Sequence, residues 1–187
     1  MPYSDPAFDK IISSVVKQIE AKTLLDIGAG AGKYGELARE VSKKIKTTAI
    51  EIEKDYIKKF KLQKLYNKVL NLSAVELIQP KFYDTNFDIV MIGDTIEHLK
   101  KSDGIDLINF LVYRCKWIVL VFPHRYLQNS VEGYSSEAHI SVWSEADFNS
   151  FERTKIFKKQ TQRLVIIRGY LEPKITLKQI EATIKGE

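Results

Sequence analysis

Residues 24–35 read LLDIGAGAGKYG, and this stretch decides the fold class of the chain. An apolar strand at residues 23–27 runs into a turn with glycine at every second position, Gly28, Gly30 and Gly32. A segment with apolar residues at helical spacing follows. Glycine has no Cβ, so the turn can adopt positive φ and let a ligand lie against bare backbone. Free N–H groups at the start of the next helix face the same crevice. Strand, turn and helix together predict a site for a nucleotide cofactor.

The spacing of the glycines indicates which cofactor. A dinucleotide fingerprint, G-x-G-x-x-G, needs a third glycine under the pyrophosphate, and Lys33 stands there instead. The pattern here is Asp26-x-Gly28-x-Gly30-x-Gly32, and an acidic residue two places before the first glycine repels a pyrophosphate but suits a cation. This pattern resembles motif I of the class I S-adenosylmethionine-dependent methyltransferases, in their small, methyltransferase-domain-only form. The resemblance implies S-adenosylmethionine as cofactor, because that molecule has no phosphate and carries a sulfonium and an ammonium group.

Strands and helices alternate along the chain. Strands are expected at residues 23–27, 46–52, 68–72, 87–92 and 117–122, and helices at about 5–19, after Gly32, at 55–66 and at 103–114. Residues 157–161 and 164–170 then read as two strands close together, hence an antiparallel pair. The alternation predicts a doubly wound α/β fold. The resemblance, which covers about residues 21–170, implies a Rossmann-like, mostly parallel seven-stranded sheet with an antiparallel C-terminal hairpin, in one domain of residues 1–187.

Bulk properties limit the function classes. The formal net charge of +5 is spread along the chain, so nucleic-acid binding is permitted but not implied. Cys115 is the single cysteine, which excludes an internal disulfide and indicates a reducing compartment. Residues 1–10 lack the apolar run of a signal peptide, and no apolar segment reaches the ~18 residues of a membrane span. We expect a cytoplasmic protein without a membrane partner; the sequence gives no indication of its oligomeric state.

The residues after each strand are the candidates for cofactor binding, because open α/β sheets bind ligands at the carboxyl ends of their strands. Glu51 follows the second strand and matches the acidic residue of the family's second motif, which accepts hydrogen bonds from both ribose hydroxyls. Asn71 and Leu72 follow the third strand; Asn71 departs from the family's acidic residue, but its amide oxygen can accept from the adenine amine. The resemblance puts the Gly93–Asp94 backbone beside the methionine portion. The predicted cofactor-binding residues are Asp26, Gly28, Ala29, Gly30, Gly32, Glu51, Ile52, Asn71, Leu72, Gly93 and Asp94.

The candidate residues for binding the methyl acceptor follow the later strands. All three histidines, His98, His124 and His139, follow strands. Residues 123–143 form a loop-rich stretch before a helix expected to begin at Ser144, and they are the candidate substrate lid. A hydroxyl or protonated amine acceptor needs a general base, and His139 and His124 are the candidate catalytic residues for that role.

Two interpretations of the histidines compete. Asp94, Glu97 and His98 are spaced i, i+3 and i+4, so on a helical turn they would share one face. Together with His139, they resemble the metal site of small-RNA 3′-terminal 2′-O-methyltransferases, in which a divalent metal orients the terminal ribose hydroxyls. The simpler interpretation is metal-free: an E-H-L run is common after the fourth strand of methyltransferases, where Glu97 and His98 would cap the helix and organise the lid.

The sequence favours the metal-free interpretation and a small-molecule acceptor, because the chain has no added RNA-binding module and only moderate positive charge. A metal-dependent RNA 2′-O-methyltransferase stays the alternative. A non-catalytic S-adenosylmethionine-binding partner subunit is a third possibility, against which the intact glycine motif argues. A nicotinamide oxidoreductase is a fourth, and Lys33 at the third glycine position argues against it.

Overall fold

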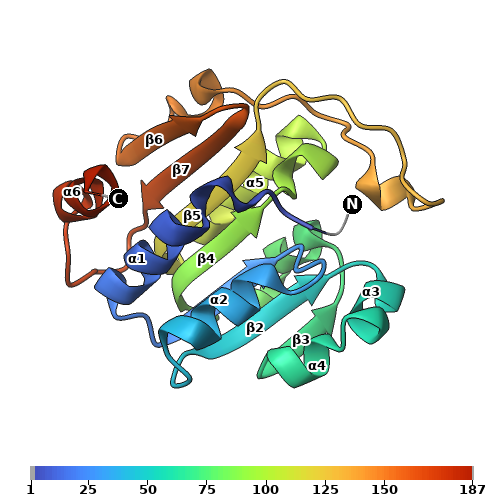
Figure 1. Cartoon of the computed structure of the whole chain (residues 1–187), viewed down its shortest axis with the longest axis horizontal. Helices are drawn as coiled ribbons and strands as arrows, with labels where there is room; N and C mark the ends of the chain where they lie inside the picture. Colours follow the sequence, from blue (N-terminus) through green and yellow to red (C-terminus); the bar gives the residue numbers. More distant parts are fainter. Residues whose placement is uncertain (1–2, 187) are drawn as a thin grey trace.

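The computed structural model of the protein describes residues 3–186. Its centre is a seven-stranded sheet with the order β3-β2-β1-β4-β5-β7-β6 (Figure 1). Neighbours from β3 to β5 pair in parallel, whereas β7 runs antiparallel to both β5 and β6. The expected doubly wound sheet with an antiparallel C-terminal hairpin is therefore confirmed. The strands are β1 Thr23–Ile27, β2 Lys46–Glu51, β3 Lys68–Asn71, β4 Phe87–Gly93, β5 Cys115–Pro123, β6 Thr154–Lys159 and β7 Gln162–Arg168.

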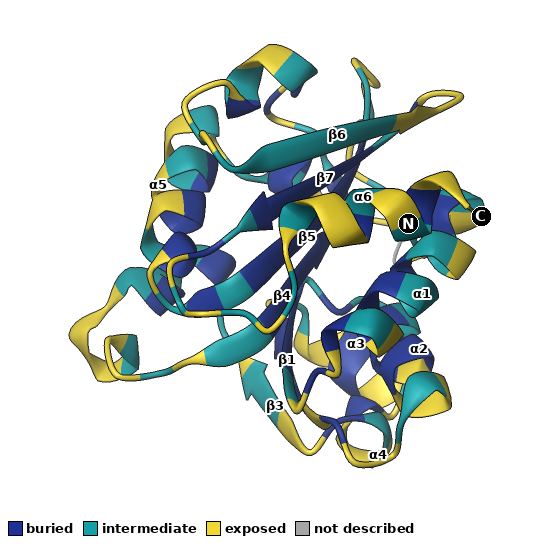
Figure 2. Ribbon diagram, turned by 90° about the vertical axis from the view of Figure 1, so that its left-hand side faces the viewer, coloured by how far each residue is buried: buried dark blue, intermediate teal, exposed yellow. Residues whose placement is uncertain are grey.

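Helices cover both faces of the sheet (Figure 2). On one face lie α1, α2 and α6, and on the other lies α5 with the short 3₁₀ helix η2. The α-helices are α1 Asp9–Ile19, α2 Lys33–Val41, α3 Lys54–Lys59, α4 Leu62–Leu65, α5 Lys101–Val112 and α6 Leu177–Lys185. The 3₁₀ helices are η1 Pro6–Phe8, η2 Ala74–Ile78, η3 Pro80–Phe82, η4 Ile96–His98, η5 Ser135–Glu137 and η6 Glu145–Phe148. Among residues 3–186, no helix is both long and apolar enough to cross a bilayer.

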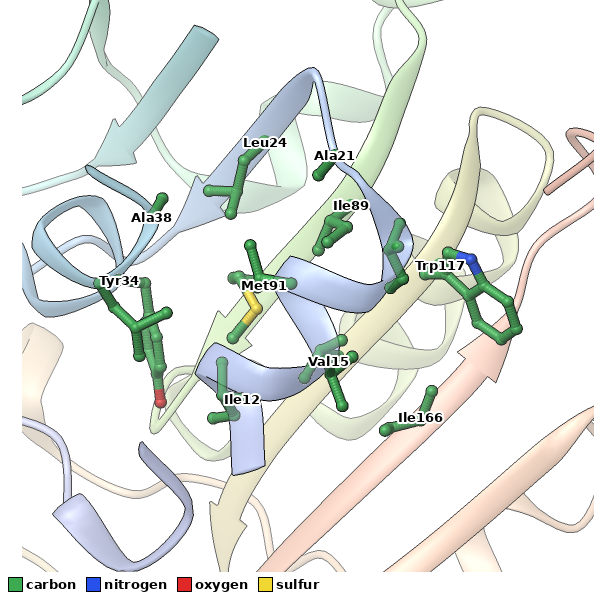
Figure 3. Packing of buried hydrophobic residues seen from close by; sticks show 14 of the residues in the cluster. Ile12, Val15, Ala21, Leu24, Tyr34, Ala38, Ile89, Met91, Trp117 and Ile166 are labelled. Carbon is green, nitrogen blue, oxygen red and sulfur yellow. The ribbon is translucent and has the colours of Figure 1, made fainter. Parts of the chain in front are cut away.

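The central strands are buried on both faces because their side chains are apolar at nearly every position. Figure 3 shows Ile12 and Val15 of α1 packed above Met91 of β4 and Ile166 of β7, in one continuous apolar cluster. Burial of this kind contributes about 25 cal/mol for each Å² of apolar surface removed from water. The sheet is thus a rigid base, and its strand ends on one edge hold the loops that build the site.

The two strands of the C-terminal hairpin, expected at residues 157–161 and 164–170, lie two to three residues earlier, at Thr154–Lys159 and Gln162–Arg168. Three further elements differ from the sequence-based expectation. The helix expected at residues 55–66 is broken into α3 and α4, because Lys61 adopts the left-handed conformation with φ 52°. The segment after Ser144 forms a single 3₁₀ turn, closed by a capping box between Ser144 and Asp147. Helix α6 was not expected; Thr176 caps it, and its Ile180 packs into the α1 face of the core.

Candidate functional site

The glycine turn between β1 and α2 needs its glycines. Gly28, Gly30 and Gly32 all have positive φ, of 74°, 51° and 92°. A Cβ on Gly28 would lie 2.2 Å from the Oγ1 atom of Thr95, so even alanine would collide there. Gly28 and Gly30 face a cavity, whereas a Cβ on Gly32 would instead meet Leu65 of α4 at 2.4 Å. The first two glycines therefore open the turn to a ligand, and the third serves close packing.

The cavity above this turn, called the first cavity below, lies at the carboxyl ends of β1, β2, β3 and β4. Together with the open solvent at its mouth it spans about 880 Å³. Seven of the predicted cofactor residues line it: Gly28, Gly30, Glu51, Ile52, Leu72, Gly93 and Asp94. Its other lining residues are Ser4, Ile50, Glu53, Tyr56, Ser73, Ala74, Thr95, His98, Leu99, Ser136 and Glu137.

Glu51 is a buried carboxylate held at the wall of the first cavity. Its two oxygens accept hydrogen bonds from the backbone N–H of Gly30 at 2.7 Å and of Glu53 at 2.8 Å. Burial raises the pKa of Glu51, against the opposing effect of these two donors. The carboxylate is thus fixed by the glycine turn and by the start of α3. This fixed orientation is what recognition of a ligand's hydroxyl groups requires.

Four predicted cofactor residues do not line the first cavity. Asp26 is fully buried beneath the turn, where it accepts a hydrogen bond from the Tyr66 hydroxyl. Asn71 donates its amide N–H groups to the carbonyls of Glu51 and Ile52, at 2.9 and 2.8 Å. Its side chain therefore holds the end of β2. Ala29 and Gly32 likewise belong to the turn's packing and not to the cavity wall.

Asp94 does not share a helical face with Glu97 and His98, as the spacing had suggested. Its φ is 45°, and the following 3₁₀ helix begins only at Ile96. The Asp94 carboxylate turns toward the N-terminal segment and accepts a hydrogen bond from the Asp5 backbone N–H at 3.2 Å. Burial raises the pKa of Asp94 to about 6. Strained backbone of this kind is typical of functional sites.

A second cavity adjoins the first. The two share Ser4, Asp94 and His98, so Asp94 and His98 stand at the junction. With its mouth the second cavity encloses about 1000 Å³. Its remaining lining residues are Tyr3, Asp5, Pro6, Glu97, Pro123, Tyr126, Gln128, His139, Thr161 and Gln162. Over the described part of the chain, acidic side chains contribute to this wall but no lysine or arginine does.

Glu97, His98 and His139 form a cluster at the edge of the second cavity. One ligand atom from each lies within 4.8 Å of the others. Nδ1 of His98 lies 3.0 Å from the Ala138 carbonyl, and Nδ1 of His139 lies 2.9 Å from the Tyr126 carbonyl. A carbonyl only accepts, so each Nδ1 is the donor in its contact, and Nε2 is the ring nitrogen left for a ligand or a proton.

Glu97 is the unusual member of the cluster. It is buried, and among residues 3–186 neither of its carboxylate oxygens has a hydrogen-bond partner. Burial, followed by the nearby charge of Asp94, raises the pKa of Glu97 well above its usual range. Burial also lowers the pKa of His98. An orphaned carboxylate facing two bare imidazole nitrogens suits a divalent transition metal, and it can equally take up a proton.

His124 is not brought to either cavity. Its Nδ1 lies 3.7 Å from Glu145, which also pairs with Arg163 and Lys158. Of the two candidate bases, only His139 borders a cavity.

The lid, residues 123–143, reaches across the molecule to α3 (Figure 1). Ser136 and Glu137 line the first cavity, which makes the segment a cover for that cavity as well as a wall of the second. These two residues and Tyr56 were missed by sequence reasoning. Neither the polar sequence of the lid nor the KDYIKK sequence of α3 indicates that these residues come together.

Comparisons with known proteins find similar sequences and folds. Residues 25–107 match the family model described as "Methyltransferase domain". No curated protein sequence matches the chain. Many solved structures share its fold, among them the following three. The N-terminal domain of EvdMO1 with SAH bound has 17% identity and a TM-score of 0.65, covering 89% of this chain and 82% of that one. A putative O-methyltransferase from Nostoc punctiforme has 13% identity and a TM-score of 0.64, covering 87% of this chain and 57% of that one. The methyltransferase domain of bacterial CtHen1 has 14% identity and a TM-score of 0.63, covering 89% and 100%.

Proposed function

We propose that this chain methylates a hydroxyl group of a small molecule bound in the second cavity. The proposal proceeds from the premise that the chain carries the domain of a class I S-adenosylmethionine-dependent methyltransferase. The observation that carries the proposal is the junction of the two cavities at Asp94 and His98. A ligand in each cavity would meet its neighbour at these two side chains. Methyl transfer is an in-line displacement, so the methyl donor and the acceptor must bind next to each other. Two adjoining cavities with lining residues in common provide that arrangement.

The residues of the first cavity fit the cofactor. S-adenosylmethionine supplies, when bound, an electrophilic methyl group on a sulfonium ion. Gly28 and Gly30 let it approach the backbone, and the fixed carboxylate of Glu51 can accept from its ribose hydroxyls. Asp94 offers a partly buried carboxyl group at the end of the cavity. A cation bound beside it would favour the ionised carboxylate and so counteract the rise in the pKa of Asp94.

His139 is the proposed general base. Its Nδ1–H is held by the Tyr126 carbonyl, so Nε2 is free to take the proton of an acceptor hydroxyl. Glu97, 3.9 Å from that nitrogen, would stabilise the imidazolium that forms. His98 stands at the junction and positions the acceptor. His98 and His139 would thus hold a deprotonated acceptor oxygen toward the methyl group that the cofactor would supply, and the sulfur of the cofactor would keep the electron pair of the broken bond.

The wall of the second cavity supports a small acceptor over RNA. Its charged members within residues 3–186 are Asp5, Asp94 and Glu97, all acidic. A phosphate backbone placed there would meet like charges and no cation, and nucleic-acid sites depend on lysine and arginine. A neutral or cationic acceptor is compatible with this wall.

A second candidate function is the metal-dependent form of the same reaction. The orphaned Glu97 and the two bare imidazole nitrogens favour it. In that case these three residues would hold a divalent cation, which would lower the pKa of the attacking hydroxyl. An RNA acceptor with a 3′-terminal ribose belongs to this alternative.

The experiment is transfer of radiolabelled methyl groups into a cell extract, fractionated into metabolites, RNA and protein, with and without EDTA. Label in the metabolite fraction that withstands EDTA supports the main proposal. Label that disappears with EDTA and returns with Mn²⁺ or Zn²⁺ supports the metal-dependent form. Binding of S-adenosylhomocysteine (SAH) without any transfer of label would refute both and would leave the non-catalytic subunit, whereas failure to bind SAH would refute all three.

A further inference from the structure

The lid closes on α3 through side chains at the rim of the first cavity. The Tyr56 hydroxyl donates a 2.8 Å hydrogen bond to Oε1 of Glu137, and the Ser136 hydroxyl donates at 2.6 Å to Oε1 of Glu53. The ring of Tyr134 packs against that of Tyr56, with centroids 4.9 Å apart. Tyr56 and Glu137 are both buried by this contact, and both line the cavity. The lid therefore forms part of the wall around any ligand in the first cavity.

The same stretch of lid also orients the histidines. The carbonyl of Ala138, directly after Glu137, accepts from Nδ1 of His98, and the next residue is His139 itself. Gln128 ties the stretch together: its amide donates to the Glu137 carbonyl at 2.7 Å, and its own carbonyl accepts from the His139 N–H at 2.9 Å. Three consecutive residues thus connect the first cavity to the second.

The two ends of the lid are anchored, so its middle is the part that can move. At one end the His124 N–H donates to the Thr161 carbonyl at 2.7 Å. At the other end Trp143 is buried, and its indole N–H donates to the Ile96 carbonyl at 3.1 Å. Between them the tip at Glu132 and Gly133 has positive φ and is exposed. The contacts that Tyr134, Ser136 and Glu137 make with Tyr56 and Glu53 therefore determine whether the first cavity is covered.

We propose that Tyr56 and Glu137 form a latch: their hydrogen bond holds the lid over the bound cofactor and, through Ala138, sets His98 and His139 for the acceptor. Tyr56 is on this account a positioning residue. Cofactor and acceptor sites are then coupled, because a ligand that stabilises the closed lid also orders the histidines. The inference rests on the proposed function for the identity of the cofactor, while the latch itself is a property of the protein without ligands.

Tyr56→Phe tests the latch, because it keeps the ring that packs on Tyr134 and removes the hydroxyl. Tyr113→Phe is the matched control, since Tyr113 is an exposed tyrosine at the end of α5 that lines neither of the two cavities. Ser136→Ala, which removes the second contact of the lid, the one with Glu53, serves if Tyr56→Phe does not fold, as judged by its melting curve. Backbone amide hydrogen exchange of residues 134–139 is measured without ligand, and SAH affinity by calorimetry.

We expect Tyr56→Phe to speed exchange of these amides and to raise the Kd for SAH, each by about tenfold, which is the effect of losing one buried hydrogen bond. Ser136→Ala should change both by a few-fold, and Tyr113→Phe should change neither. Once an acceptor is known, Tyr56→Phe should raise the KM for S-adenosylmethionine and also lower kcat, because His139 is released with the lid. Wild-type exchange and wild-type affinity in both latch variants would overturn the inference. If the wild type binds no SAH, the proposed function fails, and the exchange measurement still decides the latch.

Discussion

The Tyr66 hydroxyl donates a hydrogen bond to the buried carboxyl group of Asp26 and accepts one from the Gly35 N–H at 3.0 Å. These contacts tie the end of β1 to the start of α2 and to the residue after α4. The acidic residue before the glycine turn therefore stabilises the turn from below. Burial raises the pKa of Asp26 to about 7, against the opposing effect of the Tyr66 hydrogen bond.

The first prediction concerns the pH dependence of stability. A carboxyl whose pKa is raised in the folded state stabilises the fold when protonated, and this contribution is lost as pH rises toward and through about 7. Between pH 5 and pH 8 the loss amounts to roughly 2–3 kcal/mol. Asp26→Asn cannot ionise, so urea unfolding at both pH values should show a correspondingly smaller decrease for the variant. Equal pH profiles for the two proteins would contradict the assignment.

The second prediction concerns Gly28. Alanine there combines a φ of 74° with a Cβ 2.2 Å from Thr95, at the mouth of the first cavity. Gly28→Ala should lose the rise in melting temperature that SAH gives the wild type. Gly133→Ala is the control, since Gly133 has a similar φ of 85° but open space around its Cβ position. Both variants should lose about 1–2 kcal/mol of stability from the left-handed conformation, and only Gly28→Ala should lose the ligand response.

The third prediction concerns Glu51. In Glu51→Gln, one carboxylate oxygen that accepts from a backbone N–H becomes an amide nitrogen, which is itself a donor. We expect the Kd for SAH to rise by about tenfold or more, as for a lost hydrogen bond to a charged group. Glu40→Gln, on the exposed side of α2, is the control and should bind as the wild type does. Calorimetry measures both, and unchanged affinity in Glu51→Gln would remove Glu51 from the site.

The sheet and the glycine turn could be predicted from the sequence because their signals are local. The runs IVMI (residues 89–92) and WIVLVF (residues 117–122) are apolar without interruption, which is typical of strands buried on both faces. Glycine at every second position likewise indicates a turn with positive φ. The break at Lys61 carries no such signal, because neither proline nor glycine stands there and tertiary packing of α4 decides it.

The site was less predictable because its side chains are oriented by distant partners. Asp26 is held by Tyr66, 40 positions away, and Asn71 turns back to the carbonyls at the end of β2. The spacing of Asp94 and Glu97 suggested one helical face, yet the left-handed backbone at Asp94 separates them. Spacing predicts a shared face only where the segment is helical.

The fourth prediction separates the two candidate bases. His139 borders the second cavity, whereas His124 pairs with Glu145 outside it. His139→Asn should lower kcat for labelled methyl transfer by about 100-fold or more, the usual contribution of a general base, while leaving the Kd for SAH within about twofold. His124→Asn should stay near the wild type in both. A large loss of activity in His124→Asn with normal SAH binding would reverse the assignment.

The last prediction concerns Glu97, whose buried carboxylate has no hydrogen-bond partner among residues 3–186. Glu97→Gln removes the cost of burying this charge, so without metal the variant should be more stable than the wild type at pH 8, by about 1–3 kcal/mol.

In the metal-dependent form of the proposed function, Zn²⁺ or Mn²⁺ at 100 times its Kd would stabilise the wild type by about 2.7 kcal/mol. That corresponds to a rise in melting temperature of about 5–10 °C for a chain of this size. Glu97→Gln and His139→Asn should both lose this rise, because each removes one ligand of the cluster, whereas His124→Asn should keep it. A rise of equal size in all four proteins would show that the metal binds elsewhere, and the absence of any rise in the wild type would leave the metal-free reaction.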